Sequence, residues 1–139
     1  MIDPAQNIVN FFSRLLEPIR IGNSLKKVDV TLQQRENSNN ALWFHGDGPS
    51  DLFLWENGHH TVKSWYLEYG QKYVKWHKDD GLETGTLLPE SKPSLTAPWE
   101  KKRKKDPTFD AKVRQFALDI FMVLNFDKSE AVIATLKNG

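Results

Sequence analysis

The chain has 139 residues, of which 39% are hydrophobic and 27% are charged, and its formal net charge is +1. These values are typical of one globular domain, so we expect a single domain over 1–139, and they favour no particular class of partner. The absence of cysteine excludes disulfides, thiolate metal sites and a cysteine nucleophile. The N-terminus lacks the pattern of a signal peptide, and no apolar run reaches the length of about 18 residues that a membrane span needs. We therefore expect a soluble, cytoplasmic protein without a membrane span.

The N-terminal segment predicts an amphipathic helix. Asp3 can cap a helix, and Pro4 is tolerated at the first helical position. Apolar residues then recur at helical spacing over 8–19. Pro18 favours a helix end, because the residue before a proline is pushed out of the α region. These features predict a helix over 4–17. A turn at Gly22-Asn23, a strand over 26–34, a polar loop over 35–40 and a short strand over 41–45 are predicted to follow it.

Three turn signals divide the segment 51–90: Asn57-Gly58, Gly70-Gln71 and Asp80-Gly81. Asn-Gly and Asp-Gly tolerate the positive φ angles of type I′ turns, and Gly-X suits type II′. Runs rich in Trp, Tyr, Val, Leu and Thr separate the signals. The pattern predicts an antiparallel meander with strands over 51–56, 59–69, 72–79 and 82–88.

Two-residue turns would fix the register of this meander. Gly70-Gln71 would place Trp65 opposite Trp76, and Asp80-Gly81 would place Trp76 opposite Gly85, where an aromatic ring covers the missing side chain. One face then becomes the core face under the helices. It is expected to carry Leu52, Leu54, Trp65, Leu67, Val74, Trp76 and Leu87.

The second face of the sheet mixes aromatic and polar groups, whereas a solvated antiparallel face is usually polar. Side chains that are apolar at one end and hydrogen-bonding at the other are favoured at interfaces. Two interpretations stay open: the face binds a partner or ligand, or the chain's own loops partly cover it. The face is also expected to carry Val62, Thr84 and Thr86. The candidate binding residues on it are Phe53, Trp55, His60, Tyr66, Tyr73, Lys75 and His77.

A proline-containing segment over 91–107 is predicted to be an exposed connector. It holds a basic run that is a candidate anion-binding site or a solvated stretch. Beyond it, apolar periodicity predicts a helix over 108–126 that begins with Asp106-Pro107. Residues 129–137 fit either a short helix or a strand. The basic run consists of Lys101, Lys102, Arg103, Lys104 and Lys105.

No catalytic or cofactor motif is present. His59 and His60 point to opposite faces of a strand, and His60 and His77 are too far apart along the strands to share an ion, so no metal site is predicted. Dinucleotide, phosphate-loop and nucleophile-elbow patterns are absent. Residues 80–87 resemble one unit of a MORN-type repeat. Such arrays need several stacked units, so the resemblance implies hairpin chemistry shared by many meanders.

The predicted fold class is α+β: an N-terminal helix, an antiparallel sheet of about six strands, and one or two C-terminal helices on one face. The leading hypothesis is a non-enzymatic binding module, without a cofactor, that holds a protein partner or a second copy of itself on the aromatic face. A second hypothesis is single-stranded nucleic-acid binding through that face and the basic run, with an affinity that falls steeply with salt. A third is a carrier of a small apolar ligand inside a curved half-barrel.

Overall fold

The computed structural model describes residue 5 and residues 16–28, 41–57, 61–88, 101–124 and 126–138. It has the predicted α+β fold, with helices on one side of an open antiparallel sheet of seven strands in the order β1-β2-β3-β4-β5-β6-β7. No helix among these described residues has the length and apolarity to cross a membrane. The elements are β1 (Lys26–Lys27), β2 (Ala41–Gly46), β3 (Ser50–Glu56), β4 (Val62–Tyr69), β5 (Lys72–His77), β6 (Gly81–Leu87), β7 (Arg103–Lys105), α2 (Ala111–Val123) and α3 (Ser129–Asn138).

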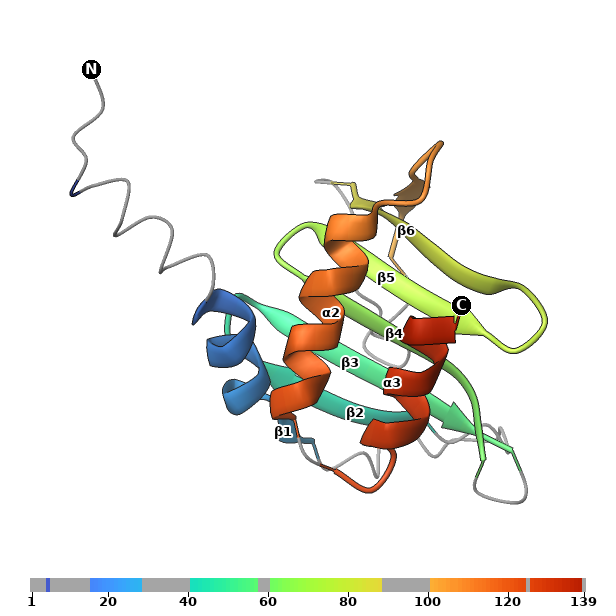
Figure 1. Ribbon diagram of the computed structural model, residues 1–139, viewed down its shortest axis with the longest axis horizontal. Helices are drawn as coiled ribbons and strands as arrows, with labels where there is room; N and C mark the ends of the chain where they lie inside the picture. Colours follow the sequence, from blue (N-terminus) through green and yellow to red (C-terminus); the bar gives the residue numbers. More distant parts are fainter. Residues whose placement is uncertain are drawn as a thin grey trace.

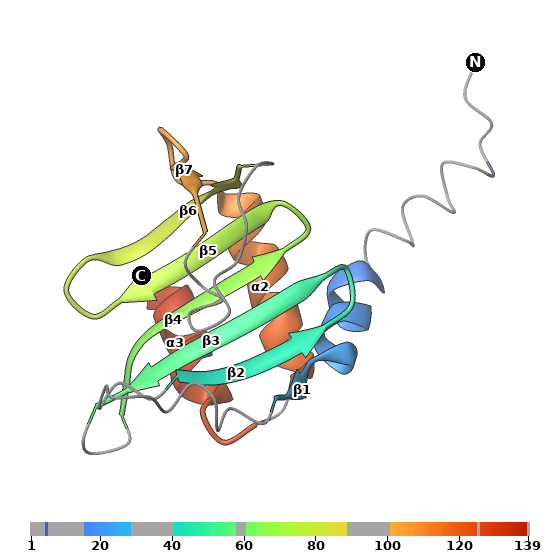
Figure 2. The same cartoon turned by 180° about the vertical axis from the view of Figure 1, so that it is seen from behind.

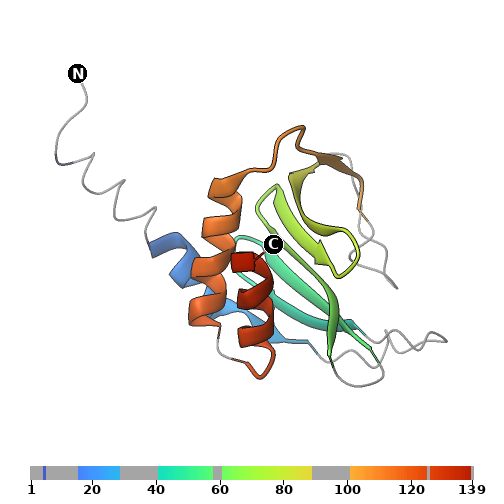
Figure 3. The ribbon, with the colours of Figure 1, turned by 45° about the vertical axis from the view of Figure 1, so that its right-hand side comes forward.

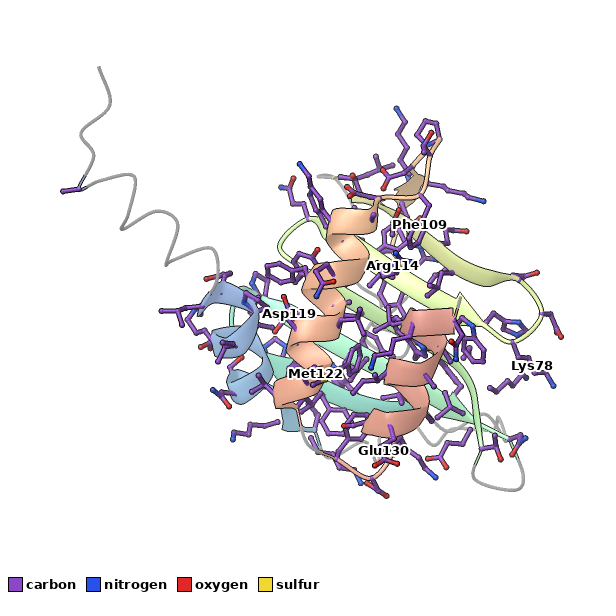
Figure 4. All side chains as sticks on the ribbon, viewed as in Figure 1. Lys78, Phe109, Arg114, Asp119, Met122 and Glu130 are labelled. Carbon is purple, nitrogen blue, oxygen red and sulfur yellow. The ribbon has the colours of Figure 1, made fainter. Side chains whose placement is uncertain are left out.

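Helices and sheet form two layers. Figure 1 shows α2 and α3 on the same face of the sheet, and Figure 3 shows the two layers from the side, with the sheet strongly twisted. α2 turns Val113, Ala117 and Ile120 toward the sheet, at the spacing of one helix face. The outer side of α2 carries Met122, which is 67% exposed (Figure 4).

The core lies between these layers, as the sequence predicts. Leu52, Leu54 and Leu67 are fully buried there. The Trp65 ring meets Phe121 of α2 edge-on, with 5.5 Å between ring centroids. Trp65 Nε1 also donates a 2.9 Å hydrogen bond to Thr135 Oγ1 of α3, so one indole fixes both helices on β4.

The helix boundaries differ from the prediction. α2 begins at Ala111 because Asp110, not Asp106, is its N-cap, with Oδ1 accepting from the Lys112 amide at 2.9 Å. Asp106 instead binds β6, where its carboxylate accepts a 2.9 Å hydrogen bond from Thr84 Oγ1. α2 also ends at Val123, earlier than predicted. The alternatives for the C-terminal segment are resolved in favour of a helix, α3.

The predicted helix end at Pro18 and the turn at Gly22-Asn23 are both wrong, because residues 16–24 are helical. Most of the predicted helix 4–17 and of the strand 26–34 lies outside the described residues. Gly22 serves close packing, since an added Cβ would lie 2.7 Å from Ile120 O and 3.0 Å from Val123 Cβ. A glycine required by a helix contact thus resembled a turn signal in the sequence.

The Gly70-Gln71 register is confirmed, with Tyr69 opposite Lys72 and Trp65 opposite Trp76. Asn57-Gly58 is not a two-residue turn, because Glu56 pairs with Val62 and the Asn57 amide donates to Thr61 O at 2.9 Å. The observed pairing of β3 with β4 differs from the prediction by an even number of residues. Leu52 and Leu54 therefore keep their predicted face.

The predicted register at Asp80-Gly81 is wrong. His77 pairs with Gly81, and a 3.1 Å hydrogen bond from the Asp80 amide to His77 O closes the turn before Gly81, whose φ is +77°. β6 is shifted by an odd number of residues relative to the predicted register, so its side chains lie on the opposite face from the one predicted. Thr84 and Thr86 therefore lie on the helix side. Leu87 lies on the second face, and Tyr73, instead of Trp76, covers Gly85.

The seventh strand lies inside the segment predicted to be a connector. β7 pairs with β6, with Arg103 opposite Leu87 and Lys105 opposite Gly85. Its three residues are all basic, which is how natural sheets discourage the pairing of an edge strand with another chain. The sheet thus has one strand more than predicted.

Replacing Gly22 by alanine tests the helix contact. Alanine favours a helix over glycine by about 1 kcal/mol, but its Cβ meets a backbone carbonyl that cannot move easily. We expect Gly22→Ala to lower the free energy of unfolding by a net of about 1–2 kcal/mol in urea titrations. Asn23→Ala, at the exposed neighbouring position, is the control and should be neutral or slightly stabilising. A stabilised Gly22→Ala variant would contradict the close packing.

Candidate functional site

The second face of the sheet carries an aromatic layer, defined here as Trp43, Phe53, Trp55, Tyr66 and Tyr73. The rings run across neighbouring strands. Trp43 stacks on Phe53 with 5.7 Å between centroids, and Tyr66 stacks on Tyr73 at the same distance. Figure 2 shows the sheet from this side, opposite the helices. The register therefore brings together most of the predicted binding residues.

Burial separates these residues into two groups. Phe53, Tyr66 and Tyr73 are 0%, 3% and 1% exposed, so they form a second small core. Trp55, Lys75 and His77 remain partly exposed at one end of the face. His60 lies outside the described residues. The covered interpretation therefore holds for Phe53, Tyr66 and Tyr73, and the binding hypothesis is left with the exposed end.

Carboxylates satisfy the polar tips of the aromatic layer. Trp43 Nε1 donates to Asp51 Oδ1 at 2.8 Å, Tyr66 Oη donates to Glu68 at 2.8 Å, and Tyr73 Oη donates to Glu83 at 2.8 Å. A buried hydroxyl or indole N–H without a partner costs free energy, so each of these rings needs its acceptor. The layer is thus a hydrogen-bonded network as well as an apolar cluster.

Burial raises the pKa of all three tyrosines of the chain, on both faces of the sheet. For Tyr66, burial is the main cause of the raised pKa, and the adjacent Glu68 raises it further. Burial and the hydrogen bond to Glu83 raise the pKa of Tyr73. On the helix side, burial and the charge of Asp110 raise the pKa of Tyr69, which stacks on Phe116. Neutral phenols are therefore favoured by the fold.

The basic run divides between structural and exposed roles. Lys101 forms an ion pair with the buried Glu68, and Lys105 Nζ lies 4.0 Å from Glu83 Oε1. The Arg103 guanidinium carbon lies 5.0 Å from the Tyr66 ring centroid and 5.6 Å from that of Tyr73. These three alternate residues face the aromatic layer, because side chains along a strand alternate between faces. The run therefore packs along the edge of the sheet, and its five cationic side chains do not all point the same way.

A cleft of about 320 Å³ opens at the exposed end of the second face. Trp55 and Tyr66 contribute aromatic surface, and Lys75, His77 and Arg103 contribute polar groups. The cleft also reaches Asp80 in the turn after β5. It combines residues of β3, β4, β5 and β7, so four separate segments of the chain build it.

Two groups in the cleft have defined hydrogen-bond roles. His77 Nδ1 accepts from the Asp79 amide at 3.1 Å, which leaves the ring proton of the neutral imidazole on Nε2 as a donor. Lys75 Nζ lies 3.7 Å from Glu83 Oε2, a charge contact longer than a hydrogen bond. The ammonium can therefore turn toward a second acceptor.

A histidine–carboxylate pair lies at the other end of the face. His45 Nδ1 lies 2.7 Å from Asp51 Oδ1, which also accepts from Trp43. Such a carboxylate orients an imidazole, as in acid–base sites, but catalysis also needs a reacting group beside the ring. Within the described part of the chain, no group of three or more potential ligands could hold a metal ion.

No protein-family model, no curated protein and no solved structure matches the chain.

Sequence reasoning missed the carboxylates of this face. Glu68 lies two residues after Tyr66 on one strand, and Asp51 lies two residues before Phe53, so strand alternation could have placed both on the aromatic face. Glu83 could not be found in this way, because the wrong register of β6 assigned it to the helix side.

Titration of the tyrosines tests their environment. A folded-state pKa above the unfolded value of about 10 contributes stability that is fully present below that pH and is lost as the pH rises through the folded value. We expect the ultraviolet absorbance of tyrosinate to stay low above pH 10 until the protein unfolds, while the protein in urea titrates near 10. Tyrosinate formation near pH 10 in a protein that keeps its circular dichroism spectrum would contradict this environment.

Proposed function

We propose that this chain is a non-enzymatic binding module that holds a segment of a protein partner in the cleft on the second sheet face. The observation that carries the proposal is the combination of a partly exposed Trp55 with the polar groups of Lys75, His77 and Arg103 in one concavity. A Trp or Arg in a pocket is the kind of group that dominates binding at interfaces. We also propose a cytoplasmic location, with which the absence of cysteine is compatible.

A rigid support lies behind the cleft. Tyr66 and Phe53, next to Trp55, are buried, and Arg103 lies against the Tyr66 ring. Side chains that packing holds in place lose less conformational freedom on binding than mobile surface groups do. The buried part of the aromatic layer thus supports the binding site from behind.

The chemistry of the cleft favours a polar partner over a small apolar ligand. Ligand pockets for apolar molecules are lined mainly by hydrophobic side chains. Here Lys75, Asp80 and Arg103 are among the lining residues, and the sheet is open at β1 and β7. A carrier role would instead need an enclosed apolar cavity.

Charge reversal on β5 tests the proposal. Lys75 points into the cleft, and Lys72 is on the same strand but on the helix side and exposed. We expect immobilised Lys75→Glu protein to lose the proteins that the wild type captures from nuclease-treated lysate of the source cells. Lys72→Glu, with the same change of charge, should retain them. Quantitative mass spectrometry of the captured proteins is the measurement.

Two further measurements are needed to interpret the result of the capture experiment. Thermal unfolding shows whether both variants fold, since Lys75→Glu places a second acid beside Glu83. Sedimentation velocity of the free proteins shows whether the partner is a second copy of the chain, in which case Lys75→Glu alone dissociates a dimer. Equal capture by wild type and Lys75→Glu would refute the cleft as the binding site.

A further inference from the structure

We infer that the segment held in the cleft is acidic, with a carboxylate next to a large apolar side chain. This inference rests on the proposed function and specifies the chemistry of the partner. It follows from the charges around Glu83, the donors in the cleft and the position of Trp55.

The charges around Glu83 leave a local excess of cations. The Glu83 carboxylate accepts from Tyr73 Oη at 2.8 Å and faces Lys75 at 3.7 Å and Lys105 at 4.0 Å. One carboxylate thus serves two ammonium groups. Arg103, over the neighbouring tyrosine rings, adds a third cation to the same region. An incoming carboxylate would therefore meet a positive potential at this end of the sheet.

The donors of the cleft also suit a carboxylate. Lys75 and Arg103 carry charged N–H groups, and His77, whose Nδ1 accepts from the Asp79 amide, carries a donor on Nε2. Charge-assisted hydrogen bonds from such groups to a carboxylate are stronger than bonds between neutral groups. Asp80 is in the turn that borders the cleft, and its Oδ2 is 4.0 Å from His77 Nδ1.

Trp55 provides the apolar half of the site. Its ring lies 6.3 Å from the buried Phe53 ring, so one side of the indole is anchored to the aromatic layer. The cleft of about 320 Å³ is at the small end of the range of roughly 300–1,000 Å³ for ligand pockets. This size suits one or two side chains of a peptide, here an acidic residue with an apolar neighbour.

A nucleic acid fits these features less well than an acidic peptide. Single strands are held by a continuous basic groove with several exposed rings on which successive bases stack. Here Phe53, Tyr66 and Tyr73 are buried, and Lys101 and Lys105 face carboxylates of the chain itself.

Fluorescence anisotropy with three labelled polymers tests this inference: random poly(Glu,Tyr), poly-Glu and oligothymidylate. We expect poly(Glu,Tyr) to bind more tightly than poly-Glu, and oligothymidylate to bind most weakly. Lys75→Gln should weaken poly(Glu,Tyr) binding by about three- to tenfold, because one charged contact is lost. Lys72→Gln, on the opposite face of the same strand, should change it less than about twofold.

Equal binding of poly-Glu and poly(Glu,Tyr) would overturn the apolar part of the inference. Tighter binding of oligothymidylate, no binding of either peptide polymer, or equal weakening by Lys72→Gln would overturn the inference as a whole. The proposed function is judged separately by the capture experiment. If capture depends on Lys75 while the acidic polymers do not bind, the cleft holds a partner of another chemistry.

Discussion

The central strands of this protein are buried on both faces, and this constraint shapes the rest of the molecule. β3 to β5 meet the helices on one side and form the aromatic layer on the other. Antiparallel sheets usually leave one face to water, where polar side chains need no protein partner. Here every buried polar tip on the second face needs an acceptor inside the protein. Trp43, Tyr66 and Tyr73 meet this requirement through Asp51, Glu68 and Glu83.

The buried carboxylates in turn require cations. Glu68 is 3% exposed, and an unpaired charge at that depth would be costly. Lys101 neutralises it, and Arg103 and Lys105 follow at alternate positions over the same face. The aromatic layer thus determines where the basic run lies and why it becomes an edge strand. Three residues of the basic run thus stabilise the fold, and one of them, Arg103, also lines the cleft.

The cleft lies where the aromatic layer meets solvent. Toward the end of β5 the aromatic layer ends at Trp55, and Lys75 and His77 meet solvent. Rigid, buried neighbours and partly exposed polar groups at their edge are the arrangement that a binding site needs, since the buried part holds the exposed part in position. The helix side differs, because Trp65, Thr135 and the apolar faces of α2 and α3 close it.

Local patterns were enough to predict most element types, though not β7 or the helix around Gly22, because helical and strand periodicity and hairpin residues act locally. The sequence placed the aromatic residues on one face of β3, β4 and β5 and predicted the register across Gly70-Gln71. The parity of the β5–β6 turn, the N-cap Asp110 and the role of Gly22 could not be predicted, because each depends on a contact with a distant segment. Burial of Tyr66 and Tyr73, and with it the limits of the cleft, was also decided by the tertiary structure. A strand pattern shows which residues share a face, but what covers that face depends on where the rest of the chain packs.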